Sequence, residues 1–169
     1  MTNSLNISLF SIQNHKFIPP NTPITMQFDP ENHINKLCAQ GMLLEGEGKS
    51  DEASALFHQA WNEATNATEK FTAAHYIARH QQNVEDKLRW DETALNLALK
   101  IEGEEIKAVY PSLYLNVAKC HEDLKDFNNA LENYQLALSH TPFLPDDGYG
   151  NMIKAGINKG VERVQSHTN

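Results

Sequence analysis

The sequence is poor in basic residues: 14 Lys and Arg stand against 22 Asp and Glu among 169 residues, which gives a net charge of −8. Binding to a phosphate backbone depends on clustered Lys and Arg that release counterions, so this balance argues against a generic nucleic-acid-binding protein. It disfavours anionic membrane surfaces for the same reason. No apolar run approaches the roughly 18 residues of a membrane span. The composition therefore excludes several classes of partner without identifying one.

Cysteine is scarce as well, with only Cys38 and Cys120 in the chain. Two cysteines cannot form a disulfide framework, and neither belongs to a CxxC pair that could help to hold zinc. The short apolar stretch near the N-terminus has no Lys or Arg before it and no small-residue cleavage site, so it does not resemble a secretory signal. We therefore expect a cytoplasmic protein, in which the Cys120 thiol is buried as a small apolar group.

Motifs of enzyme active sites and cofactor loops are missing. The sequence contains no G-x-x-x-x-G-K-[ST], no G-x-G-x-x-G after a strand, no G-x-S-x-G and no H-E-x-x-H. His75 and His80 are five residues apart, a spacing that does not place two metal ligands on one helical face. The segment Gly148-Tyr149-Gly150 is expected to form a turn. We predict no catalytic residue, no metal site and no cofactor.

Residues 1–33 differ in composition from the rest of the chain. They include the segment Ile18-Pro19-Pro20-Asn21-Thr22-Pro23 and show no helical periodicity. Proline fixes φ and has no N–H to donate, so it favours extended or irregular chain here. We predict a flexible N-terminal extension over 1–33, followed by one helical domain over 34–168.

From residue 34 onward, apolar residues recur at spacings of three and four, which predicts helices throughout. Glycine, proline and polar clusters separate these helices, and Asp146 and Asp147 can cap the last of them. The expected helices cover 34–45, 51–65, 69–80, 84–101, a fifth from between 104 and 111 to 124, 127–139 and 149–165.

Two parts of the chain share one spacing pattern, small-x11-Ala-x3-aromatic-x2-Ala. Small residues at these points let two antiparallel helices approach closely, and the aromatic residue fills the gap between neighbouring helical hairpins. The pattern resembles the tetratricopeptide repeat (TPR). The matching residues are Gly41, Ala53, Phe57 and Ala60 in the first part, and Ala118, Ala130, Tyr134 and Ala137 in the last, which adds Pro142.

The resemblance covers about residues 34–145 and implies an all-α fold, a right-handed α-α superhelix of about three TPR-like hairpins plus a C-terminal capping helix. The hairpins are expected over 34–67, 69–102 and 105–144, and the capping helix over 149–165. Their spacing exceeds the usual 34 residues, and the excess is expected in longer helices around Gly103.

The middle hairpin departs from the repeat pattern. Ala74 is expected at the close contact between its two helices. The second helix offers Asp86 or Lys87 where alanine is expected, and Trp90 or Asp91 where the aromatic residue is expected. The register of this hairpin is therefore open by one residue.

In this family the first helices of successive hairpins line a concave groove that takes peptides or helices of partner proteins. The resemblance therefore implies a non-catalytic adaptor or scaffold that binds a protein segment of acidic and apolar character. The groove positions carried over are Asn35, Cys38, Met42 and Glu45 in the first hairpin, Phe71, His75 and Arg79 in the second, and Ser112, Leu115, Lys119 and Glu122 in the third.

Three alternatives remain open at this stage. The groove residues can be ordinary exposed helix positions, or lie under the N-terminal segment or the last helix. The chain can be a helical enzyme or an RNA-modification protein, such as one with rRNA methyltransferase activity, which the missing cofactor motif disfavours. It can also be a structural protein that associates with itself, for instance as a homodimer. The family's chaperone-tail-binding activity is not expected, because Cys38 and Met42 stand where that subset has Lys and Asn.

Overall fold

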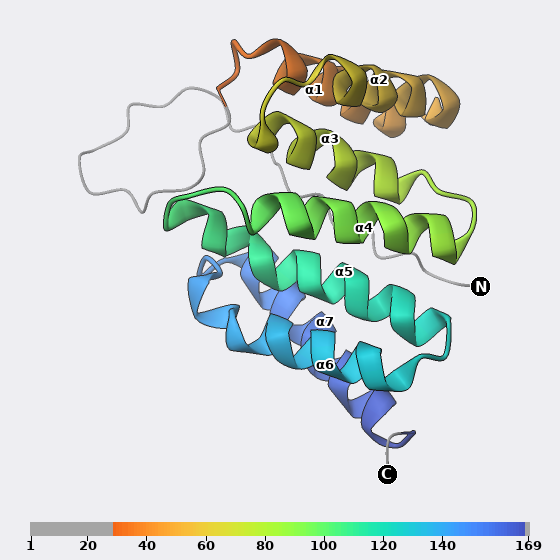
Figure 1. Ribbon diagram of the computed structural model, residues 1–169, viewed down its shortest axis with the longest axis vertical. Coiled ribbons are helices and arrows are strands. Elements are labelled where there is room, and N and C mark those ends of the chain that lie inside the picture. Colours follow the sequence, from red (N-terminus) through yellow and green to blue (C-terminus); the bar gives the residue numbers. More distant parts are fainter. Residues whose placement is uncertain (1–28, 168–169) are drawn as a thin grey trace.

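The computed structural model describes residues 29–167, which form helices and no strand (Figure 1). The prediction for the extension therefore lies almost entirely outside the described residues. Helices were expected in seven places, and a helix is present in each. They are α1 (His33–Gly46), α2 (Ser50–Glu63), α3 (Ala67–Arg79), α4 (Val84–Ala98), α5 (Tyr110–Asp123), α6 (Phe127–Ser139) and α7 (Gly148–Gln165), with 3-10 helices η1 (Glu105–Val109) and η2 (Thr141–Phe143).

Short polar side chains start most of these helices. The side chains of Asn32, Asn66, Asn83, Asp126 and Asp147 each accept a hydrogen bond from a backbone N–H in the first turn of the helix that follows. Such caps satisfy donors that have no partner inside the helix. The expected cap at Asp147 is confirmed, and it makes Gly148–Gly150 the first turn of α7 and not a separate turn.

The helices pack as successive antiparallel hairpins, α1/α2, α3/α4 and α5/α6, and α7 closes the array against α6 and α5. The result is a right-handed superhelix of TPR-like hairpins, in which sequence order follows the long axis of the molecule (Figure 1). Within residues 29–167, no helix combines the length and apolar character needed to cross a membrane.

Glycine and aromatic rings meet at the tightest helix contacts. A Cβ atom at Gly41 would overlap the ring of Phe57, and a Cβ atom at Gly160 would overlap the ring of Tyr134. Both rings are fully buried, and Phe57 also stacks on Tyr76 of α3 with centroids 4.9 Å apart. The pairing of Gly41 with Phe57 expected from the repeat pattern therefore brings α1 onto α2, and a second pairing, of Gly160 with Tyr134, which the pattern does not include, brings α7 onto α6.

The structure settles the register of the middle hairpin. Helices α2, α4 and α6 each begin seven residues before one fully buried position, which holds Phe57, Asp91 and Tyr134 respectively. In the first hairpin, the close-contact residue Gly41 lies sixteen residues before Phe57. The residue sixteen positions before Asp91 is His75, so His75 holds the close-contact position of the middle hairpin. The expectation of Ala74 there is wrong by one residue, because an aspartate occupies the aromatic position and removes the signal that would have fixed the register.

The extra residues between the second and third hairpins lie in their connection. Helix α4 ends at Ala98 and α5 begins at Tyr110. The intervening segment contains η1 and Gly103, whose φ of 124° is favourable only for glycine. The expectation of longer helices around Gly103 is therefore wrong. Pro111 lies in the first turn of α5, where its missing N–H costs nothing.

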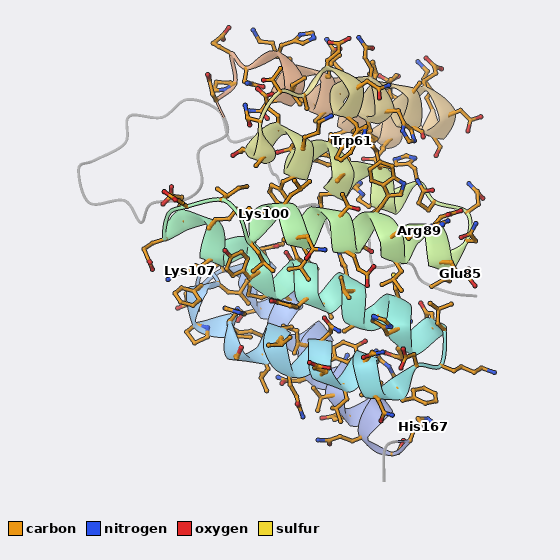
Figure 2. All side chains as sticks on the ribbon, viewed as in Figure 1. Trp61, Glu85, Arg89, Lys100, Lys107 and His167 are labelled. Atoms are coloured by element: carbon orange, nitrogen blue, oxygen red, sulfur yellow. The ribbon has the colours of Figure 1, made fainter. Side chains whose placement is uncertain are left out.

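The two tryptophans join the second helices of the first two hairpins. The rings of Trp61 in α2 and Trp90 in α4 meet edge to face with centroids 5.0 Å apart, and the ammonium of Lys70 lies 4.4 Å from the centroid of the Trp61 ring. Trp61 is labelled in Figure 2, where it lies between α2 and the two following helices. These contacts place both fluorophores at the boundary between the first and second hairpins.

Candidate partner-binding face

The structure buries five of the eleven predicted groove residues. Their side chains pack inside the array and are not accessible to a partner in this conformation, whereas the other six are at least partly exposed. The buried residues are Cys38, Phe71, His75, Ser112 and Leu115, and the accessible ones are Asn35, Met42, Glu45, Arg79, Lys119 and Glu122.

The error in the middle hairpin follows from the complete burial of α3. Phe71 belongs to the apolar cluster that α3 shares with α4 and α5, and His75 holds the close-contact position between α3 and α4. Residues 71–78 are all buried, so a shift of the register by one residue, to Thr72 and Tyr76, would not have reached the surface either. Cys38 is buried in the first hairpin and does not line an open groove as expected, and burial raises the pKa of its thiol to about 12.

Helix α7 covers one of the predicted residues in α5. Leu115 lies against the backbone of Gly156, where a Cβ atom would sit 3.3 Å from Cδ2 of the leucine. Ser112 is fully buried and donates a hydrogen bond to the carbonyl of Val109. One of the alternatives drawn from the sequence, coverage by the last helix, therefore holds for Leu115.

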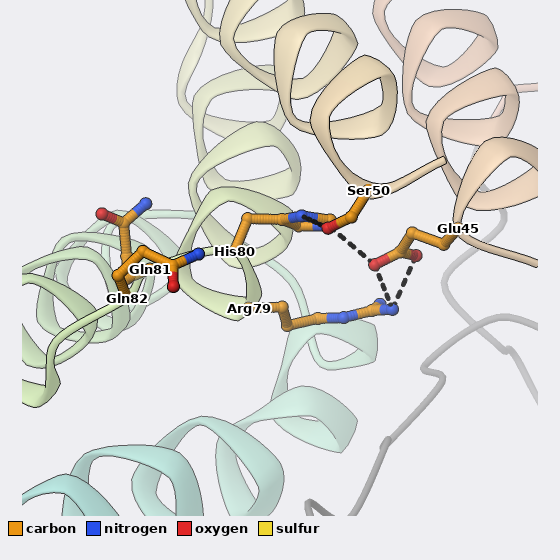
Figure 3. Close-up of a pocket in the computed structure, with 6 residues that line it drawn as sticks. All are labelled: Glu45, Ser50, Arg79, His80, Gln81 and Gln82. Atoms are coloured by element: carbon orange, nitrogen blue, oxygen red, sulfur yellow. Dashed lines mark hydrogen bonds and ion pairs between the residues drawn. The ribbon is translucent and has the colours of Figure 1, made fainter. Parts of the chain in front are cut away.

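An ion-paired cluster joins the ends of α1 and α3. Both Oε atoms of Glu45 accept hydrogen bonds from Nη2 of Arg79, at 2.8 and 2.7 Å, and Nε2 of His80 lies 2.8 Å from Oε1 of the same carboxylate. Ser50, at the start of α2, contacts the other ring nitrogen of His80 at 3.3 Å. We call Glu45, Arg79, His80 and Ser50 the α1–α3 bridge (Figure 3).

The α1–α3 bridge borders an open, polar pocket of about 260 Å³, which Gln81 and Gln82 complete. The side chains of Glu45 and Arg79 are each 20 % exposed, so the pair is partly shielded from solvent. Nη1 of Arg79 is buried and has no hydrogen-bond partner among residues 29–167. Because the two Glu45 oxygens occupy only one of its terminal nitrogens, the guanidinium retains a donor for another acceptor.

A similar cluster joins α5 to α7. Nε and Nη2 of Arg163 donate to the two oxygens of Glu122 at 2.7 and 2.8 Å, and the hydroxyl of Tyr134 donates to the same carboxylate at 2.5 Å. Burial opposes ionisation of Glu122, but the hydrogen bonds from Arg163 and Tyr134 outweigh it and hold the pKa of the carboxyl below its ordinary value. We call these three residues the α5–α7 bridge.

Lys119 is the one lysine of α5. It is about half exposed and pairs with Asp123 one turn later in the same helix. Exposed pairs of this kind contribute little to stability, so the ammonium can exchange Asp123 for another carboxylate at small cost. No group of three or more His, Cys, Asp or Glu side chains within residues 29–167 is placed to hold a metal ion. The chemistry that these residues support is reversible ion pairing and hydrogen bonding.

Sequence reasoning missed His80, Ser50 and Arg163, which complete the two bridges. The sequence does contain a signal for Arg163. Glu45 and Glu122 occupy equivalent positions, each four residues after the small residue at a close contact, Gly41 and Ala118. An arginine in the last helix can therefore serve Glu122 as Arg79 serves Glu45. The resemblance implies only a capping role for the last helix and so points to no groove position in it. The structure instead packs α7 against α5 and α6, and Arg163 pairs with Glu122 as Arg79 pairs with Glu45.

Comparison with known proteins supports the fold. The fold resembles that of PcrH. A crystal structure of PcrH in complex with the chaperone binding region of PopD matches 86 % of this chain and 100 % of that chain, with a TM-score of 0.61 and 16 % sequence identity. No family model matches the chain, and no curated protein matches it. At this identity the likeness shows the fold alone, a TPR-like helical array.

Proposed function

We propose that this chain is a non-catalytic adaptor of the TPR family that binds a peptide or helix of a partner protein along α1, α3 and α5. The observation that carries the proposal is the shared fold with PcrH, whose structure contains the chaperone binding region of another protein, PopD. The interaction domain is taken as residues 34–168, with 1–33 as its extension. The protein acts in the cytoplasm, without nucleic acid or membrane as partner.

The accessible residues suggest the chemistry of the partner segment. Arg79 is partly exposed, but its unpaired nitrogen Nη1 is buried, so the guanidinium has to shift to reach a partner, whereas Lys119 is held only by an exposed carboxylate on its own helix. Met42 supplies a partly exposed apolar side chain on α1, and its sulfur accepts a hydrogen bond from the hydroxyl of Tyr76 on α3 at 3.0 Å. A segment that carries acidic and apolar side chains fits this combination.

Site-specific photo-crosslinking tests the proposal directly. A photoreactive amino acid is introduced at Asn35 or Lys119, on the proposed binding face, and at His58 or Gln135, which are exposed on α2 and α6. In cells that express the full chain, both positions on the proposed face should crosslink to the same protein. Positions 58 and 135 should not. Equal crosslinking from all four positions, or none from positions 35 and 119, would contradict the proposed face.

A matched pair of charge reversals then tests the acidic character of the partner. Lys119→Glu should weaken capture of the crosslinked partner at least about tenfold, the effect of losing about 1.4 kcal/mol of binding free energy. Lys100→Glu makes the same change in charge at an exposed site after α4 (Figure 2), and it should leave capture unchanged. If both variants capture the partner as well as the wild type does, an acidic segment is not what this face binds.

A further inference from the structure

The first helices of the three hairpins, α1, α3 and α5, and the last helix α7 follow one another along the array, and the boundaries between them are not alike. Helix α1 packs directly against α3, and α5 packs directly against α7, whereas α3 and α5 meet at no more than isolated points and are joined through α4. An ion pair crosses each of the two direct boundaries, Glu45–Arg79 and Glu122–Arg163. Within the part of the chain that the structure describes, no ion pair joins α3 to α5. The boundary between α1–α4 and α5–α7 is therefore the one that lacks a direct connection between first helices.

One end of this boundary is built from buried polar groups. Asp91 occupies the position that holds Phe57 and Tyr134 in the other hairpins, and it is 1 % exposed. Its Oδ2 accepts a hydrogen bond from Nζ of Lys87 at 2.5 Å and a weak one from Sγ of Cys120 on α5 at 3.5 Å. His75 on α3 is 2 % exposed, and neither ring nitrogen has a partner among residues 29–167. We call His75, Lys87, Asp91 and Cys120 the polar cluster.

The other end of the same boundary is apolar. Phe71 at the start of α3, Leu95 near the end of α4 and Leu113 at the start of α5 belong to one buried cluster. The connection from α4 to α5 adds Ile106 and Val109 to this cluster. The cluster reaches Val117 on α5 and Leu88 on α4 as well, so the apolar contacts are densest at the end of α4, and polar groups interrupt them toward its start.

The two ends differ in what separation costs. Exposing the apolar cluster to water loses hydrophobic stabilisation in proportion to the area exposed. Exposing the polar cluster returns water to the buried Asp91 and His75, while the Lys87 side chain is already 34 % exposed. Neither buried group gains much from burial: an ion pair roughly offsets the desolvation of its charges, and the imidazole nitrogens have no partner to offset theirs. The polar end is therefore the easier end to open.

We propose that α5–α7 hinge away from α1–α4, opening at the polar cluster and pivoting about the apolar cluster. The movement changes the spacing between Arg79 on α3 and Lys119 on α5, and so adapts the proposed binding face to partner segments of different width. It is a property of the free chain, so its test does not depend on the proposed function.

Distances between paired spin labels test the hinge in the full chain. Asp51, Glu85 and Asn128 are each the exposed second residue of α2, α4 and α6, at the end of the molecule where the polar cluster lies. Labels at positions 85 and 128 span the proposed hinge, whereas labels at 51 and 85 lie within one half. The labels are attached to p-acetylphenylalanine residues through a reagent that does not modify thiols, so Cys38 and Cys120 stay in place although opening at the polar cluster would expose Cys120.

The 85–128 pair should show a second, longer-distance population that the 51–85 pair lacks. The variant Lys87→Met/Asp91→Leu replaces the buried ion pair by apolar side chains, and it should remove that population. Equally narrow distributions for the two wild-type pairs would overturn the proposal whether or not the variant folds. A long-distance population that persists in the folded variant would overturn the role given to the polar cluster.

Discussion

The ring of Tyr134 in α6 lies directly against the backbone of Gly160 in α7, so closely that the glycine has no room for a side chain. The same relation holds between Phe57 and Gly41 in the first hairpin. In both places the glycine lets a fully buried ring fill the space between helices, and the hydroxyl of Tyr134 reaches Glu122 beyond it. The last helix is thus fixed to the array by shape as well as by the Glu122–Arg163 ion pair.

The fit at Gly160 predicts a sharp sensitivity to one added carbon. Gly160→Ala should lower the free energy of unfolding by about 1–3 kcal/mol, the usual cost of overpacking a core, although alanine favours helix more than glycine does. Urea unfolding followed by circular dichroism measures the change. Gly46→Ala is the control, because no atom lies within 4 Å of a Cβ placed there, and its stability should be unchanged or slightly raised. Equal stability of the two variants would show that α7 shifts freely against Tyr134.

His75 predicts a loss of stability in mild acid. Burial lowers the pKa of its imidazole to about 3, and the nearby positive charges of Arg79 and Lys87 act in the same direction. The unfolded chain binds this proton near the ordinary pKa of about 6.5, so the contribution of His75 is complete above that pH and falls as the pH drops toward 3. Between neutral pH and about pH 5 this one group should cost about 2 kcal/mol.

The matched experiment for His75 compares two histidine variants. His75→Leu removes the buried titrating group, so the stability difference between neutral pH and pH 5 should shrink by most of that amount. His58→Gln removes an exposed histidine from α2 and should follow the wild-type curve. If His75→Leu keeps the full wild-type pH dependence in urea unfolding, the imidazole is not held neutral by burial.

The Lys87–Asp91 pair predicts a non-additive response to mutation. Lys87→Met leaves the carboxylate of Asp91 buried without its partner and should destabilise the protein by about 3–5 kcal/mol. Adding Asp91→Leu should recover most of this loss, because apolar side chains of similar volume often replace a buried ion pair without cost. Calorimetric melting of both single variants and the double variant measures the coupling.

The exposed pair Lys119–Asp123 has the same residue types at the same spacing and serves as the control for that cycle. Lys119→Met should cost less than about 1 kcal/mol, since water already solvates both charges. A double variant at positions 87 and 91 that is no more stable than Lys87→Met alone would show that the pair holds the helices together by more than its charges.

The sequence allowed the helices and the first and third hairpins to be predicted, because caps, apolar periodicity and the small–aromatic spacing are local signals. The middle hairpin was misplaced by one residue since Asp91 stands where an aromatic residue would have fixed the register. Leu115 was expected on the surface because nothing local to α5 indicates that α7 packs against it. The six accessible residues of the predicted face stay a prediction until a partner is mapped.

The two buried cysteines predict an order of chemical reactivity. The thiolate is the reactive form, and burial raises the pKa of both thiols to about 12, so neither should react quickly with a thiol reagent in the native protein. Cys120 belongs to the polar cluster at the proposed hinge, whereas Cys38 is buried in the first hairpin, so Cys120 should be modified first. Mass spectrometry of digests taken over time identifies the modified residue, and Ser139→Cys, at an exposed site in α6, shows the rate for an open thiol.

Lys87→Met/Asp91→Leu should slow modification at Cys120 and leave the rate at Cys38 unchanged. Faster reaction at Cys38 than at Cys120 in the wild type would place the weakest boundary of the array in the first hairpin.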